Sequence, residues 1–179
     1  MPDNYLNLLS NITTFIFDVD GVMTNNTVTI TSDGDQLRTM NIRDGFALQY
    51  AVKRGYRIAI ISGGKSESVK SRFTRLGITD IYLGVADKRE KLEEVIDTYS
   101  IDPNTIAYMG DDLPDYEVMT MVGLPACPKD ATYEIKNIST YVSPNKGGEG
   151  CVRDIIEQTL KAQGKWFDPT KIKDKDFVW

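Results

Sequence analysis

The sequence predicts an α/β protein built on a doubly wound parallel sheet of the Rossmann-like type. Short apolar strands alternate along the chain with amphipathic helices, a pattern typical of parallel strands that helices cover on both faces. In addition, Asp18, Ser62 and Asp111 each lie within two residues after the end of a predicted strand. Because ligands bind at the carboxyl ends of parallel strands, we expect these three side chains to meet at one edge of the sheet.

In the first half of the chain, apolar runs give strands and a four-residue spacing of apolar residues gives helices. Asp33–Gly34 between two alternating runs indicates a hairpin turn. The expected elements are a buried strand at Thr13–Phe17, hairpin strands at Thr27–Thr31 and Gln36–Met40, a helix from about Asp44 to Arg54, a strand at Arg57–Ile61, a helix carrying Val69, Phe73 and Leu76 that Gly77 closes, and a strand at Ile81–Leu83.

The second half continues the alternation and ends in a segment of different composition. The expected elements are a helix from Lys88 carrying Leu92, Val95, Ile96 and Tyr99, strands at Thr105–Met109, Leu124–Ala126 and Tyr141–Val142, and helices at about Pro114–Val122 and Gly150–Gln163. We expect one domain at residues 1–165 and a C-terminal tail at 166–179. The tail is either a partly disordered end or a segment that docks Phe177, Val178 and Trp179 on a neighbouring subunit.

Composition narrows the class of function. The net charge is −5 and the basic residues are scattered, which argues against a nucleic-acid or membrane partner. With no signal peptide evident, no run long enough to cross a bilayer and only two cysteines, we expect a cytoplasmic protein with reduced thiols. The absence of histidine excludes His-based triads and His-ligated zinc, so carboxylates, Lys, Tyr or Cys must do any acid–base work.

Two acidic motifs follow predicted strands. DVDGVMT at 18–24 places Asp18 and Asp20 two residues apart, and GDDLPD at 110–115 adds Asp111. Buried carboxylates need a compensating cation, and Mg²⁺ prefers such oxygen ligands. Asp18 is then a candidate nucleophile, and Asp20 a candidate acid and base that protonates the leaving alcohol and activates water.

Two further motifs offer groups that bind a phosphate. Ser62 can donate its hydroxyl to a phosphate oxygen, with the amide of Gly63 nearby, and Lys88 can oppose the developing negative charge. Taken singly, each motif has an ordinary interpretation as a turn, a loop, a helix cap or a solvated helix start. The occurrence of all four motifs in this order, each at a strand end or helix start, is not expected by chance.

These motifs resemble those of the haloacid dehalogenase superfamily of aspartate-dependent phosphotransferases, over residues 12 to 165. The resemblance implies that Asp18 is the nucleophile and Asp20 the acid and base, with Ser62 and Lys88 holding the phosphate. It implies that Asp18, the carbonyl of Asp20 and Asp111 hold Mg²⁺. Asp112 and Asp115 are supporting residues, and Asp115 orients Lys88 or a metal-bound water.

The gaps between the motifs are too short for a cap domain, since they hold only a hairpin flap, helices and a short strand. The chain therefore resembles the capless (C0) subgroup. An uncapped site is open to water, so we expect specificity to come from a neighbour's hairpin or tail in a homotetramer, as capless relatives form.

Within that subgroup the chain is similar to the 3-deoxy-D-manno-octulosonate 8-phosphate (KDO 8-phosphate) phosphatase family of lipopolysaccharide precursor synthesis. The similar segments are NIRDGFAL at 41–48, VKSRFTRLGI at 69–78, YMGDDLPD at 108–115, NKGGEG at 145–150 and LKAQGK at 160–165. The resemblance implies a small-molecule sugar phosphate as substrate. Besides Asp20, Gly63 and Lys88, the implied contacts are Asn41, Ile42, Arg43, Asp44, Gly45, Lys65 and Arg72, of which Arg43, Lys65 or Arg72 can pair with a sugar carboxylate.

Other functions remain open. Well-known members carry cations where this chain has Gly64 and Gln49, so the nine-carbon KDN 9-phosphate and related sialic-acid-type 9-phosphates are alternative substrates. Receiver domains share the sheet, Mg²⁺, Asp, Ser or Thr, and Lys, but they lack an acid two residues beyond the acceptor. A non-catalytic scaffold is disfavoured because every catalytic position is present, and a phosphomutase usually needs a cap.

Overall fold

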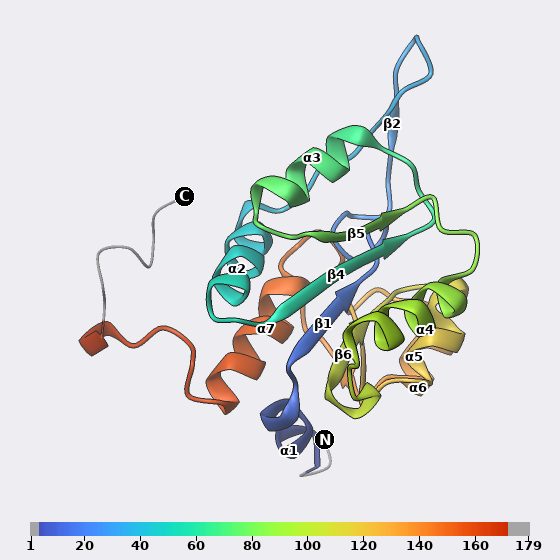
Figure 1. Cartoon of the computed structure of the whole chain (residues 1–179). Helices are drawn as coiled ribbons and strands as arrows, with labels where there is room; N and C mark the ends of the chain where they lie inside the picture. The colour runs from blue at the N-terminus through green and yellow to red at the C-terminus, as the bar shows by residue number, and fades with distance from the viewer. Residues whose placement is uncertain (1–3, 172–179) are drawn as a thin grey trace.

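A single sheet of six parallel strands forms the centre of the molecule in the computed structural model, which describes residues 4–171 (Figure 1). The strand order is β5-β4-β1-β6-β7-β8. The strands are β1 Thr14–Phe17, β4 Arg57–Ser62, β5 Asp80–Leu83, β6 Ile106–Met109, β7 Leu124–Cys127 and β8 Tyr141–Val142. This arrangement confirms the predicted parallel α/β fold.

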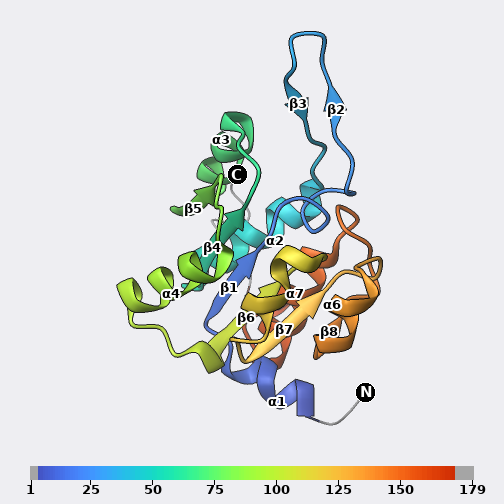
Figure 2. The ribbon, with the colours of Figure 1, turned by 90° about the vertical axis from the view of Figure 1, so that its right-hand side faces the viewer.

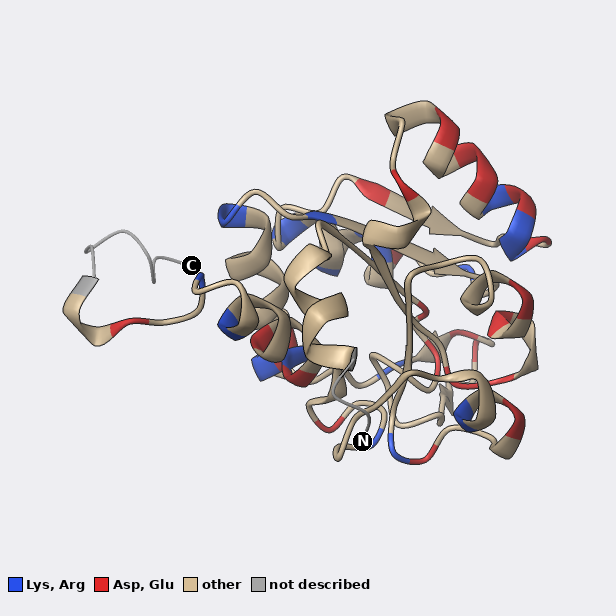
Figure 3. Cartoon of the chain, turned by 90° about the horizontal axis from the view of Figure 1, so that it is seen from below, with Lys and Arg blue, Asp and Glu red and all other residues tan. Residues whose placement is uncertain are grey.

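Helices cover both faces of the sheet, because side chains alternate along each strand and both sets are apolar. Phe15 and Phe17 pack with α1 Asn4–Asn11, α2 Ile42–Lys53, α3 Glu67–Arg75 and α7 Cys151–Ala162. On the other face, Ile16 and Tyr108 pack with α4 Lys88–Tyr99, α5 Tyr116–Met119 and α6 Tyr133–Ile138. In the ribbon of Figure 3, the positions of basic residues are spread over several elements of the fold, as predicted from their scatter along the sequence.

The sheet aligns the strand ends that carry the polar motifs. β1 lies between β4 and β6, and Phe17 is in register with both Ile60 and Met109. The residues that follow these three strands therefore leave the sheet at one edge, at a topological switch point where ligands bind in α/β sheets. The expected convergence of the strand ends follows directly from this register.

The hairpin projects from the body of the protein beyond the sheet (Figure 2). Its strands, β2 Thr29–Ile30 and β3 Gln36–Leu37, are antiparallel and shorter than predicted, with only two residue pairs in register. A two-stranded ribbon without a covering layer is weakly held, which accounts for the short pairing. Gly34 closes the turn with φ +89° and donates its backbone N–H to Thr31 O.

Other boundaries differ for local reasons. α2 begins at Ile42 because the side chain of Asn41 accepts from the amides of Arg43 and Asp44. The helix expected at Pro114–Val122 is instead a 3-10 turn, η2 Leu113–Asp115, and the one-turn helix α5. Helices α1 and α6 were not predicted, since each is too short for a clear periodic signal. The remaining 3-10 turns are η1 Pro103–Thr105 and η3 Pro169–Lys171.

The start of the predicted tail contacts the domain. Trp166 packs edge-on against Tyr50 of α2, with ring centroids 5.2 Å apart. Just before it, the Gln163 side chain donates to the carbonyls of Leu9 and Ile12 and ties α7 to the end of α1. The tail aromatics Phe177 and Trp179 lie outside the described residues.

No inserted domain interrupts residues 4–171: a hairpin and α2 separate β1 from β4, which agrees with the expectation of a capless protein. Within the same residues, no helix has the length and apolar character needed to span a bilayer.

Candidate active site

Asp18 follows β1 directly, so the sheet fixes its backbone at the switch point. Its backbone amide donates to Met109 O of β6. Its carboxylate accepts the Val19 amide at 2.7 Å and pairs with Lys88 Nζ at 2.9 Å. Burial and the neighbouring Asp115 raise the pKa of Asp18 to about 7, although Lys88 opposes this shift. The buried carboxylate is therefore costly to ionise without a further cation.

Lys88 is the first residue of α4, and its ammonium group bridges two carboxylates. Its Nζ lies 2.9 Å from Asp18 Oδ2 and 2.7 Å from Asp115 Oδ1, and its side chain is only 8% exposed. Burial lowers the pKa of Lys88, but Asp18 and Asp115 outweigh burial and leave that pKa raised. The ammonium group is thus held charged and pointed at Asp18.

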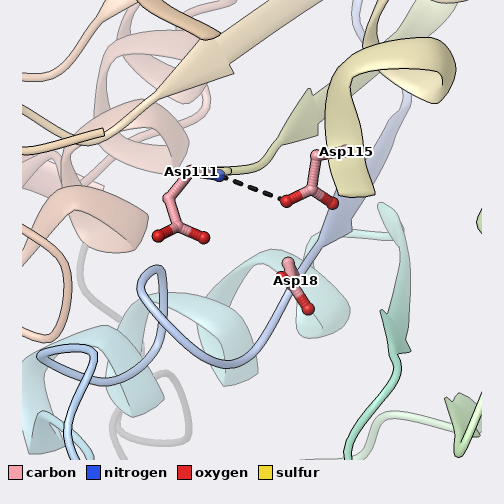
Figure 4. A group of neighbouring side chains, drawn as sticks. All are labelled: Asp18, Asp111 and Asp115. Carbon is pink, nitrogen blue, oxygen red and sulfur yellow. Dashed lines mark hydrogen bonds between the residues drawn. The ribbon is translucent and has the colours of Figure 1, made fainter. Parts of the chain in front are cut away.

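Asp115 accepts three hydrogen bonds. Besides Lys88, the hydroxyl of Tyr108 donates to Oδ1 at 2.8 Å. The amide of Asp111 donates to Oδ2 at 3.2 Å, the bond drawn as a dashed line in Figure 4. Burial raises the pKa of Tyr108, and the facing Asp115 adds to this rise, so the phenol stays a donor. Asp115 therefore positions Lys88, Tyr108 and the backbone of Asp111.

Asp111 faces Asp18 across the site (Figure 4). The side-chain amide of Asn26 donates to Asp111 Oδ2 at 3.0 Å. Burial raises the pKa of Asp111 to about 7, with Asp18 and Asp115 adding to the rise. Gly21, at φ +83°, makes room for this carboxylate, because a Cβ at position 21 would lie 1.9 Å from Asp111 Oδ2.

These residues fit a hard divalent cation. Oxygens of Asp18, Asp111 and Asp115 lie within 4.8 Å of one another, and only carboxylates contribute to the group. Magnesium prefers such oxygen donors. Asp115 accepts more hydrogen bonds than Asp18 or Asp111, which agrees with its predicted role as a supporting residue rather than a metal ligand.

Ser62, Gly63 and Gly64 leave the end of β4 beside Asp18. The amide of Gly64 donates to Ser62 Oγ at 3.2 Å. The amides of Gly84 and Val85 donate to the carbonyls of Gly64 and Ser62 and fix the loop to the end of β5. One cleft of about 640 Å³ joins this loop to the acidic cluster; it is lined by Asp18, Asp20, Ser62, Gly63, Lys88, Asp111, Asp112 and Asp115, among others.

Asp20 also lines the cleft, and it has a partner that the sequence motifs did not reveal. Arg38, just beyond β3, donates Nε to Asp20 Oδ1 at 2.7 Å and Nη2 to Asp20 Oδ2 at 3.0 Å. A single basic residue in a hairpin strand has the appearance of an exposed, alternating position. No local signal identifies Arg38 as a neighbour of the acidic motif.

The predicted substrate contacts at 41–45 lie elsewhere in the protomer. Asn41 and Arg43 line a separate groove of about 410 Å³ together with α7, and Ile42 is 72% exposed. The Asn41 side chain also donates to Gly148 O. Asp44 is 2% exposed and accepts the backbone amide of Arg153 at 2.7 Å, so it holds the start of α7.

Lys65 and Arg72 are likewise not among the residues that line the catalytic cleft. Lys65 lies over Gly84 and lines a groove of about 630 Å³ between the hairpin and the start of α3. Arg72 lies against Gly45, where an added Cβ would be 2.4 Å from Arg72 Nη2. This contact connects α3 to α2, and a side chain at position 45 would require Arg72 to shift.

Comparison with known proteins gives a consistent family. Residues 74–155 match the family model of haloacid dehalogenase-like hydrolases. The chain is similar to the KDO 8-phosphate phosphatase of Yersinia pestis, with 36% identity over 165 residues that cover 92% of this chain and 88% of that one. It is 37% identical over 155 residues to the KDO 8-phosphate phosphatase of Escherichia coli (strain K12), covering 87% and 82% of the two chains.

Solved structures agree with the sequence comparison. The KDO 8-phosphate phosphatase of Moraxella catarrhalis, in complex with a magnesium ion, a phosphate ion and a KDO molecule, resembles this chain with a TM-score of 0.87. The two are 31% identical, and the match covers 91% of this chain and 94% of that one.

We expect Mg²⁺ to stabilise the fold by binding at the cluster of Asp18, Asp111 and Asp115. A cation between Asp18 and Asp111 offsets the repulsion of two buried carboxylates, so Mg²⁺ at about 100 times its Kd should add about 3 kcal/mol. In thermal unfolding this corresponds to a shift of roughly 5–10 °C. Asp111→Asn and Gly21→Ala should lose most of the shift, whereas the exposed neighbour variant Asp112→Asn should keep it. Equal shifts in all four proteins would show that Mg²⁺ binds elsewhere.

The buried carboxyl group of Asp44 should make the stability of the fold depend on pH. Burial raises the pKa of Asp44 to about 6, despite the hydrogen bond from Arg153, and its Oδ2 is buried without a hydrogen-bond partner. The folded state therefore binds this proton more tightly than the unfolded state, so stability is lost as pH rises from about 4 through about 6. Relative to wild type, Asp44→Asn should gain about 2 kcal/mol between pH 4 and pH 7.5 in urea unfolding. Parallel pH profiles for the two proteins would contradict this assignment.

Proposed function

The chain belongs to the haloacid dehalogenase-like hydrolases, in the group of the KDO 8-phosphate phosphatases, and on this basis we propose that it hydrolyses KDO 8-phosphate to KDO and inorganic phosphate. The cofactor is Mg²⁺, held by Asp18, the backbone carbonyl of Asp20 and Asp111. When bound, the ion neutralises carboxylate and phosphate charge.

One observation carries the proposal: Lys88 Nζ lies 2.9 Å from Asp18, and Asp115, which also accepts the hydroxyl of Tyr108, holds Lys88 in that position. Phosphoryl transfer depends mainly on positioning and charge neutralisation, and this arrangement supplies both at a single buried carboxylate. Asp20 lies two residues away and is half-exposed at the mouth of the same cleft.

In the first step, a carboxylate oxygen of Asp18 attacks phosphorus and the bond from phosphorus to the ester oxygen breaks. Asp20 transfers a proton to that oxygen, so the sugar leaves as an alcohol. Ser62 and Lys88 hold the phosphoryl oxygens, with the amide of Gly63 beside them.

In the second step, water attacks the aspartyl-phosphate. Asp20 takes the proton from the water, the bond between phosphorus and Asp18 breaks, and inorganic phosphate leaves. Both carboxyl groups return to their starting states. Asp112 and Asp115 support this cycle, Asp115 by fixing the ammonium group of Lys88.

The remaining substrate contacts involve a neighbouring copy in a homotetramer. The hairpin carries exposed apolar side chains at Val28, Ile30 and Leu37, which suit burial against another subunit. Three exposed residues contact the sugar that such a copy binds: Ile42, Arg43 and Lys65. The surface around Ile42 and Arg43 is held in place by the residues that pack beneath it, Asn41, Asp44, Gly45 and Arg72. The location is the cytoplasm, which suits two buried and unpaired cysteines.

The preferred substrate is tested by comparing kcat/KM for KDO 8-phosphate, KDN 9-phosphate and common hexose phosphates in Mg²⁺. KDO 8-phosphate should exceed the hexose phosphates by at least about 100-fold, because a second anion on the substrate adds charge-assisted contacts. Asp18→Asn and excess EDTA are the controls that must abolish turnover. A higher value for KDN 9-phosphate would assign the nine-carbon sugar instead, and equal values for all esters would refute an acid-sugar phosphatase.

Assembly is tested by sedimentation of the full chain. We expect a tetramer, and replacement of Ile30 and Leu37 together by Ser should give smaller species with a raised KM for the sugar phosphate. Thr29→Ser and Gln36→Asn, on the same two strands, are controls that should leave assembly unchanged. A monomer with full selectivity among sugar phosphates would contradict the role of a neighbour.

A further inference from the structure

Among the hairpin residues that the structure describes, Arg38 is the one that contacts the acidic motif at 18–24. It lies just beyond β3, and its side chain is only 7% exposed even though the hairpin projects from the protein. Its Nε and Nη2 donate to the two oxygens of Asp20 at 2.7 and 3.0 Å. Such two-point pairing fixes both the position and the plane of a carboxylate.

Other contacts hold the guanidinium in this orientation. Its Nη1 donates to Gln36 O at 3.3 Å within the hairpin. On the opposite side, a Cβ at Gly64 would lie 3.2 Å from Arg38 Nη2 and 3.4 Å from Asp20 Oδ2. The pair therefore lies directly against position 64, where a Cβ would be in tight contact with the arginine.

We propose that Arg38 is a positioning residue that aligns Asp20 for proton transfer to the leaving oxygen. This rests on the proposed function, because it requires Asp20 to act as acid and base. Each carboxylate oxygen has a second lone pair, so Asp20 can carry its proton while both hydrogen bonds to Arg38 remain. One proton passes from Asp20 to the ester oxygen in the first step and is recovered from water in the second.

The pairing also makes the flap part of the active site of its own protomer. A carboxylate that is 37% exposed would otherwise sample several rotamers in water. Arg38 restricts it to one, and the restriction depends on the hairpin being in place. The flap therefore contributes to the chemical step as well as to any contact with a neighbouring copy.

The test compares two esters that differ in their need for an acid. A sugar phosphate has an alkoxide leaving group that must be protonated, whereas p-nitrophenyl phosphate releases a stable phenolate. The value of kcat/KM reports only steps up to formation of the phosphoenzyme, so it isolates the acid role. Arg38→Met should lower kcat/KM for KDO 8-phosphate by about 10- to 100-fold, and for p-nitrophenyl phosphate by less than about 3-fold.

Two variants separate positioning from charge and from general damage. Arg38→Lys keeps the charge but not the two-point geometry, so the loss should be intermediate. Arg57→Met removes an arginine that pairs with Asp80 at the opposite end of β4 and should leave the ratio of the two kcat/KM values unchanged. An equal fall for both esters in Arg38→Met, or no fall, would overturn the proposal.

A double-mutant cycle tests whether Arg38 acts through Asp20. In an Asp20→Asn background, Arg38→Met should cause less than about 2-fold further loss for the sugar phosphate, because the group it positions is gone. A further loss as large as that in the wild-type background would overturn the proposal. Failure of the proposed function has a different signature, since the unmodified protein in Mg²⁺ would then not hydrolyse KDO 8-phosphate at all.

Discussion

Repulsion between buried carboxylates is the constraint around which the site is built. Asp18, Asp111 and Asp115 present oxygens within 4.8 Å of one another, and burial removes the water that would screen their charges. A single ammonium group, that of Lys88, bridges two of the three. Burial, together with the neighbouring carboxylates, raises the pKa of both Asp18 and Asp111 to about 7. The same cost of ionisation favours a divalent cation between these carboxylates.

The fold supports this concentration of charge through the sheet and through glycine. β1 lies between β4 and β6, so Asp18 reaches the edge of the sheet beside the ends of both neighbours. Gly21 then turns the chain where any side chain would overlap Asp111, and Tyr108 supports Asp115 from within β6. These groups lie on rigid strands and their immediate extensions, which suits a reaction that depends on positioning.

The sequence predicted the parts of the protein that local rules determine. The succession of strands and helices along the chain, the meeting of strand ends at one edge and the positions of Asp18, Ser62 and Asp111 all follow from apolar runs with polar residues at their ends, and Lys88 follows from the predicted start of a helix. Arg38 could not be predicted, because its contact with Asp20 depends on how the hairpin folds back, and its sequence neighbours give no indication of this. The segment 41–45 lies outside the cleft of its own chain, and the burial of Asp44 against α7 depends on tertiary packing that local sequence does not show.

The central claim is that Asp18 becomes covalently phosphorylated. The most direct measurement is rapid acid quench during turnover of KDO 8-phosphate that is radiolabelled in its phosphate group, followed by borohydride reduction and peptide mapping. The label should appear on the protein before phosphate is released, and reduction should convert residue 18 to homoserine. Release of phosphate without labelled protein, or a label on any other residue, would contradict the covalent route.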